Sequence, residues 1–132
     1  MIYDIKVIPA KQMRYPTCGD WIWSKGLHDD EVYLYIKVAD LGDWRMETCC
    51  AIHELVEAVI CNVRGIGQLQ VDNFDIEYEA NRKAGDNSEP GNSRKAPYYW
   101  PHVIATFVEH IVAYFLKVDW KEYEKKINEL EY

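Results

Sequence analysis

The stretch "EVYLYIKVADLGDWRMETCCAIHELVEAVICNVRG", residues 31–65, changes its hydrophobic period part-way along. Over 31–40, apolar and polar side chains alternate, which predicts a β-strand with one buried face. From residue 43 onward, apolar side chains recur every three or four positions, which predicts a helix over 43–64. Asp43 suits the N-cap of this helix and Gly65 suits the residue after its end. A strand followed by a long helix favours an α+β domain.

The flanking sequence extends this pattern in both directions. Two shorter stretches at 2–8 and 19–24 read as strands, and their short connections predict an antiparallel meander over 1–40. The remaining elements are expected as a short helix at 71–82, a surface loop at 83–100, a second long helix at 101–118 and a C-terminal helix at 119–132. The predicted fold is a single α+β domain, 1–132, in which a small antiparallel sheet of about three strands packs against two long helices plus two shorter helices.

Composition limits the classes of function. The chain has 132 residues, 48% of them hydrophobic, and a formal net charge of −7, which disfavours long nucleic acids and anionic membrane surfaces as partners. No segment resembles a signal peptide, and no apolar stretch approaches the ~20 residues that span a bilayer. The four cysteines include the adjacent pair Cys49 and Cys50, which fits reduced thiols better than a disulfide framework. We therefore expect a cytoplasmic protein.

The helix at 43–64 carries a polar stripe opposite its valines. At about 100° per residue, His53, Glu54 and Glu57 share one side, and no lysine or arginine lies between 46 and 63. The helix at 101–118 repeats this design with His102 and Glu109. If the two stripes face each other, these five side chains converge. Burying so many charges unpaired would cost several kcal/mol each, so something must compensate them.

A divalent metal ion, most simply zinc, would compensate the stripe. His53 and Glu57 lie one helical turn apart and His102 would supply the third ligand, with Glu109 as an alternative ligand or an orienting group. Glu54 would then act as the general base of a metal-dependent hydrolase. The sequence leaves two alternatives open, namely His–Glu ion pairs without a metal and a pocket for an organic ligand. Cys50 and Cys61 lie on the same helical side, so thiolate ligation is also open, although a buried cysteine is more often core.

Histidines outside the two stripes are less informative. His28 falls in an expected turn, and His110 falls at the edge of its stripe, where surface exposure is the simpler interpretation.

The end of the 83–100 loop offers a different kind of site. It gathers two basic and three aromatic side chains, namely Arg94, Lys95, Tyr98, Tyr99 and Trp100. Aromatic stacking with a neighbouring basic pair would suit a nucleotide-like small molecule. Exposed aromatics are also typical of protein interfaces, so a host protein or a symmetric homo-oligomer is an alternative partner for the same surface.

Several longer segments resemble a family of small uncharacterised proteins of tailed bacteriophages and prophages. The resemblance covers nearly the whole chain and rests on "CGDW", "GDWRMETCCAIHELVEAVIC", "FDIEYEANR", "EPGNSRKAPYY" and "PHVIATFVEHIVA". It implies expression in the cytoplasm of a bacterial host. It also implies a non-enzymatic alternative, an anti-defence binding protein that sequesters a nucleotide-like ligand or a host protein.

The segment His53-Glu54-Leu55-Val56-Glu57 also resembles the helix of minimal zincins. That resemblance implies a metal site of His53, Glu57 and His102 with Glu54 as the base. The chain departs from the zincin motif at Glu57, where zincins have a second histidine. It therefore implies either a hydrolase with a carboxylate ligand or a degenerate one.

Overall fold

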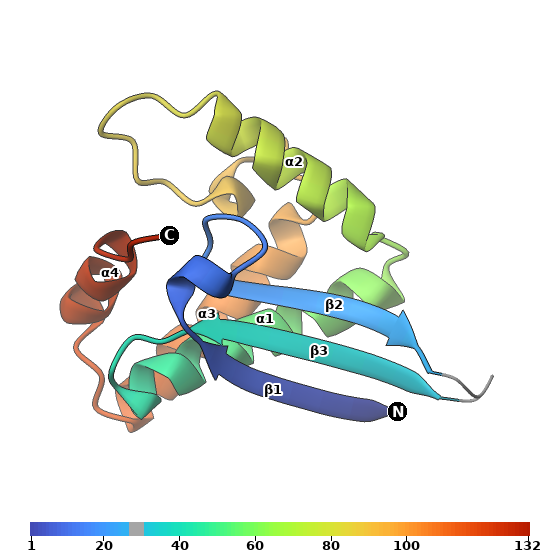
Figure 1. Ribbon diagram of the computed structural model, residues 1–132, viewed down its shortest axis with the longest axis horizontal. Coiled ribbons are helices and arrows are strands. Elements are labelled where there is room, and N and C mark those ends of the chain that lie inside the picture. Colours follow the sequence, from blue (N-terminus) through green and yellow to red (C-terminus); the bar gives the residue numbers. More distant parts are fainter. Residues whose placement is uncertain (27–30) are drawn as a thin grey trace.

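The structure is a computed structural model that describes residues 1–26 and 31–132, so His28 lies outside the described residues. A three-stranded sheet and four α-helices make up the α+β domain (Figure 1). The strands are β1 (Ile2–Ile8), β2 (Gly19–Lys25) and β3 (Val32–Ala39). The helices are α1 (Trp44–Val63), α2 (Gln68–Ala80), α3 (Tyr99–Phe115) and α4 (Trp120–Asn128), with 3-10 turns at Ala10–Gln12 and Pro90–Asn92.

The sheet is mixed, with strand order β1-β3-β2. β2 and β3 form the expected antiparallel pair, but β1 runs parallel to β3, so the predicted all-antiparallel meander is wrong at β1. β3 carries the longest run of alternating apolar residues, and it takes the central place, where a strand is paired on both edges. The connection 9–18 passes the end of β3 to reach β2, and the Ala39 N–H donates to the carbonyl of Cys18 within it.

Helices α1 and α3 lie against one face of the sheet, behind it in Figure 1. On this face, Leu34, Ile36 and Val38 of β3 are fully buried, as the alternation predicted, and Trp21 of β2 lies beside Ile36. The opposite face carries Tyr33 and Tyr35, whose rings stack 5.7 Å apart. α1 therefore packs on β2 and β3, and this packing fixes its position relative to β2.

The ends of the helices follow local sequence signals. Asp43 caps α1 by accepting the Arg45 N–H, and Gly65 follows α1 at φ +69°, a backbone conformation that glycine adopts without strain. Asp119 caps α4 as expected, accepting from the Glu122 N–H. Two helices begin earlier than predicted. α2 begins at Gln68 after Gly67, and α3 begins at Tyr99, so Tyr99 and Trp100 belong to its first turn.

Each of the two long helices buries the side that carries its histidine and glutamate and exposes several of its large apolar residues. His53 and Glu57 of α1 are buried together with small residues such as Ala58 and Cys61, and α3 likewise buries His102 and Glu109 with Ala105 and Ala113. In contrast, Val63 is 81% exposed and Phe107 is 65% exposed. The small residues let the two helices approach closely, so the polar stripes form the interface between them. Among the described residues, no helix combines the length and apolar character needed to cross a membrane.

Candidate metal centre

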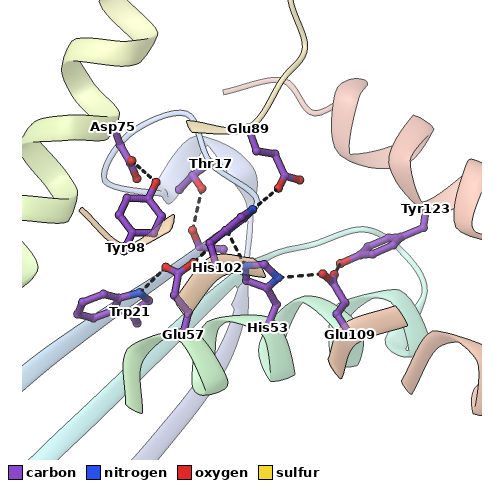
Figure 2. Close-up of polar contacts among 11 residues, drawn as sticks. Thr17, Trp21, His53, Glu57, Asp75, Glu89, Tyr98, His102, Glu109 and Tyr123 are labelled. Carbon is purple, nitrogen blue, oxygen red and sulfur yellow. Dashed lines mark hydrogen bonds and ion pairs between the residues drawn. The ribbon is translucent and has the colours of Figure 1, made fainter. Parts of the chain in front are cut away.

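Three side chains from α1 and α3 meet in a compact triangle of possible metal ligands (Figure 2). Nε2 of His53 lies 3.2 Å from Nδ1 of His102 and 3.5 Å from Oε2 of Glu57. The third side, from Nδ1 of His102 to Oε2 of Glu57, measures 3.0 Å. All three residues are buried. The predicted convergence of the two stripes is therefore present, and this His-Glu-His group could hold a metal ion.

The dimensions of the triangle are those of a small tetrahedral site. Zinc ligands lie at about 2.0–2.1 Å from the metal, which places the donor atoms of an ideal tetrahedron roughly 3.3 Å apart. The three observed separations, 3.0 to 3.5 Å, bracket that value. Three protein ligands with one further position is also the pattern of catalytic rather than structural zinc sites.

The second ring nitrogen of each histidine faces a carboxylate. Nδ1 of His53 lies 2.9 Å from Oε2 of Glu109, and Nε2 of His102 lies 3.1 Å from Oε2 of Glu89. Metal-binding histidines are typically oriented in this way, with the distal N–H donated to a carboxylate or carbonyl oxygen. Glu109 therefore lies behind His53 and not in the triangle, in the orienting place that the sequence left open for it.

Two aromatic side chains extend this network at its ends. The Trp21 indole N–H donates to Oε1 of Glu57 at 3.1 Å, and the Tyr123 hydroxyl donates to Oε1 of Glu109 at 2.6 Å. Both carboxylates are thus held on one oxygen while the other faces a histidine (Figure 2). The network connects β2, α1, α3 and α4, so every layer of the fold positions the site.

The carboxylates around the two histidines favour the charged form of the imidazoles when no metal is bound. Burial opposes the positive charge of His53, but its hydrogen bonds to Glu109 and Glu57 outweigh burial and raise its pKa well above the usual value. Burial is likewise outweighed at His102, where Glu57 and Glu89 raise the pKa. Burial alone would raise the pKa of Glu57, yet its hydrogen bonds to His102 and His53 lower it to about 2. Without a metal, these side chains therefore form buried ion pairs.

Glu54 lies beside the triangle and against β2. An added Cβ on Gly19 would come within 2.3 Å of its Oε1, so the absence of a side chain at Gly19 gives the Glu54 carboxyl its place. Burial and the neighbouring charge of Glu57 raise the pKa of Glu54 well above its usual value. Glu54 is thus adjacent to the candidate ligands without being one of them.

The triangle and Glu54 line a cavity of about 480 Å³. β2, the residues before it, α2, the loop after α2 and α4 form its other walls. Its lining holds ten carboxyl groups, two of which, Asp20 and Asp72, are paired with Arg14. Among the described residues, Arg82 is the only lysine or arginine in the lining. Such a cavity attracts cations and repels anionic ligands.

The 3-10 turn Pro90–Asn92 packs closely on His102. A Cβ built on Gly91 would lie 2.4 Å from the imidazole, so any larger residue must displace the ring or the turn. We predict that Gly91→Ala lowers zinc affinity roughly tenfold, as loss of an orienting contact does, and costs about 1–3 kcal/mol of stability. Isothermal titration calorimetry and chemical denaturation measure both.

Gly67→Ala is the matched control, because the nearest atom to its added Cβ would lie 3.7 Å away. It should leave zinc affinity unchanged. Equal zinc affinity in Gly91→Ala and the native protein would show that the placement of His102 does not depend on this turn.

The residues of the alternative loop site are not gathered in one place. Tyr98 is buried, and its hydroxyl donates to Asp75. Trp100 is 62% exposed and contacts Tyr99, whereas Lys95 lines a separate hollow with Phe74 and Tyr78. Arg94 is exposed outside that hollow. Tyr98 is therefore closed to a stacking ligand in this conformation.

The other candidates are not part of the triangle, although Cys50 and His110 line the same cavity. Cys50 and Cys61 are buried free thiols, and the Cys50 sulfur lies 3.4 Å from that of Cys18. His110 is exposed and stacks on Trp120, with ring centroids 3.6 Å apart. Neither cysteine belongs to the group of possible ligands.

Sequence reasoning missed the outer partners of the site. Trp21, Glu89 and Tyr123 come from three different elements, and nothing in their local spacing distinguishes them from core or surface residues. The one usable signal was Tyr123, a residue with a polar tip inside the apolar stripe of α4, because a buried tyrosine hydroxyl needs a partner.

No protein-family model matches the chain, and neither a curated protein nor a solved structure matches it. The resemblance to bacteriophage proteins therefore stays a prediction, and the functional argument rests on the geometry of the site.

Proposed function

We propose that the protein binds one zinc ion through His53, Glu57 and His102 and uses it in a hydrolytic reaction. The observation that carries the proposal is the triangle of donor atoms, with sides of 3.0, 3.2 and 3.5 Å, buried at the wall of an open cavity. The carboxylate beside the second ring nitrogen of each histidine fits the proposal, because metal-binding histidines are typically oriented in this way.

Zinc would supply a Lewis acid that activates water at neutral pH. The residues of the chain would do the rest. Glu54 follows His53 in the sequence and lines the same cavity, so it could accept the proton of an attacking water. Glu109, which itself accepts from Tyr123, contacts Nδ1 of His53 and holds the imidazole in one orientation. The acidic cavity favours a neutral or cationic substrate. A setting in the cytoplasm of a phage-infected bacterium is part of this proposal.

Two other functions make different predictions. If the stripes only fix the register of α1 against α3, the same side chains satisfy one another as ion pairs and no metal is needed. If the protein is instead an anti-defence binding protein, its ligand need not touch the triangle at all.

The test is metal analysis of protein purified without a His tag. We expect about one zinc ion per chain by mass spectrometry. We also expect zinc at roughly a thousand times its Kd to stabilise the fold by about 4 kcal/mol, which raises Tm by roughly 10–15 °C in a domain of this size. Substoichiometric metal together with an unchanged Tm on adding zinc, manganese or iron would reject the metal site in favour of ion pairs.

A further inference from the structure

β1 is an edge strand whose apolar side chains are only partly covered. Its residues Tyr3, Ile5 and Val7 pair in register with Leu34, Ile36 and Val38, so they belong to the face of the sheet that the helices cover. Yet they are 54%, 50% and 47% exposed, whereas their β3 partners are fully buried. The helices cover β2 and β3 and leave β1 uncovered. Among the described residues, no element pairs with the outer edge of β1.

The hydrogen-bonding groups on that edge belong to the same residues. The carbonyl of Ile8 accepts from the Asp40 N–H on the inner side, and successive residues of a strand alternate in the direction of their backbone groups. Lys6, Asp4 and Ile2 therefore point their backbone groups toward β3. The backbone groups of Tyr3, Ile5 and Val7 point outward, where a bare edge of this kind invites another strand.

The sequence of β1, "IYDIKVI", is complementary to itself when read in reverse. An antiparallel copy centred on Ile5 would place Ile5 opposite Ile5, Tyr3 opposite Val7 and Ile2 opposite Ile8. It would also place Asp4 opposite Lys6 of the partner, twice over, because the pairing is two-fold symmetric. Opposite charges across neighbouring strands stabilise a sheet and fix its register.

The backbone directions agree with this register. Tyr3, Ile5 and Val7, whose N–H and C=O groups point outward, would form the hydrogen-bonded pairs. Asp4 and Lys6 would fall in the non-hydrogen-bonded positions, where opposed side chains lie closest in an antiparallel ladder. Within one chain these two already form an ion pair of 2.8 Å, so both charged groups lie at the same solvent-facing surface of the strand.

We propose that two copies of this chain associate by antiparallel pairing of β1 with β1, which joins their sheets into one six-stranded sheet across a two-fold axis. The occupant of the edge is a second copy and not a foreign strand, because charge and side-chain size match in the reversed sequence of β1 itself. The uncovered residues Tyr3, Ile5 and Val7 of both copies would then lie together on the helix-covered face. Such a self-complementary contact is the kind that a two-fold dimer requires.

A charge-swap series in analytical ultracentrifugation tests the proposal. Asp4→Lys places two lysines opposite each other in each pair, and Lys6→Asp places two aspartates there, so each variant should weaken self-association by roughly tenfold or more. Mixing the two variants restores opposite charges in every pair and should give a heterodimer. The double variant Asp4→Lys/Lys6→Asp should dimerise like the native protein.

Ile5→Pro provides an independent arm, since it removes only an outward N–H and proline is tolerated at such edge positions. It should be monomeric with native circular dichroism. Lys121→Asp, an equal charge change on the exposed surface of α4, should leave the dimer intact. A native protein that stays monomeric at every concentration, or a dimer that persists in Ile5→Pro, would overturn the proposal.

Discussion

His102→Ala should abolish zinc binding and also destabilise the fold. His102 supplies one corner of the ligand triangle and is the nearest partner of Glu57, at 3.0 Å. Even loss of an orienting group typically costs 10–100-fold in metal affinity, so loss of a ligand should cost at least about 100-fold. The truncation also leaves the Glu57 carboxylate buried with less compensation, and breaking a buried pair costs about 3–5 kcal/mol, or roughly 10–20 °C in Tm.

Separate measurements distinguish the loss of stability from the loss of zinc affinity. Denaturation in the presence of a chelator reports the cost of the broken ion pair, and calorimetry with zinc reports the lost ligand. His110→Ala is the matched control, because His110 lies on the same helix but is exposed and stacks on Trp120. A His102→Ala protein that still binds one zinc ion with native affinity would contradict the proposed ligand set.

Much of the fold was predictable because its signals are local. The period change between 31–40 and 43–64 identified β3 and α1, and Asp43 and Gly65 fixed the ends of α1 through side-chain and backbone preferences that need no tertiary context. The parallel pairing of β1 was not predictable in the same way. The alternating pattern of β1 is compatible with pairing to β2 or to β3, in parallel or antiparallel. The tertiary structure decides, because β3 takes the central position and pairs with β1 in parallel.

The centre of the site was predictable because each of the two helices carries a histidine and a carboxylate at helical spacing, four residues apart on α1 and seven apart on α3. A histidine and a carboxylate recur on one side of each helix, so facing helices must bring them together. The burial of that side was harder to foresee, since hydrophobicity alone favours burial of the valine side. The structure shows why polarity prevails here, because each buried charge has a partner and the small Ala58 and Ala113 permit close packing.

The outer contacts of the site depend on the tertiary structure and therefore carry no local signal. Glu89 reaches His102 from a long loop, and Trp21 reaches Glu57 from a strand that precedes it by more than thirty residues. Gly91 would have been read only as a turn residue, although its missing side chain makes room for an imidazole. Sequence spacing locates ligands on one element, but it does not locate the groups that orient them from another.

Glu54→Gln should leave zinc bound and remove hydrolytic activity. Glu54 lies outside the ligand triangle, and an amide of the same size fits against Gly19 as the carboxyl does, so neither affinity nor fold should change. An amide cannot accept a proton at neutral pH, and loss of a general base typically lowers kcat by 10²–10⁴-fold. Activity is measured on zinc-loaded protein with p-nitrophenyl acetate and with internally quenched peptides, alongside zinc affinity by calorimetry.

Glu131→Gln makes the same chemical change at an exposed position and should retain full activity. The possible outcomes separate the two parts of the proposed function. Native protein that binds zinc but hydrolyses none of these probes would refute the hydrolase and leave the metal site standing, in line with a degenerate zincin-like centre. A Glu54→Gln protein that hydrolyses the probes as fast as the native protein would show that Glu54 is not the general base, because loss of the base should lower kcat.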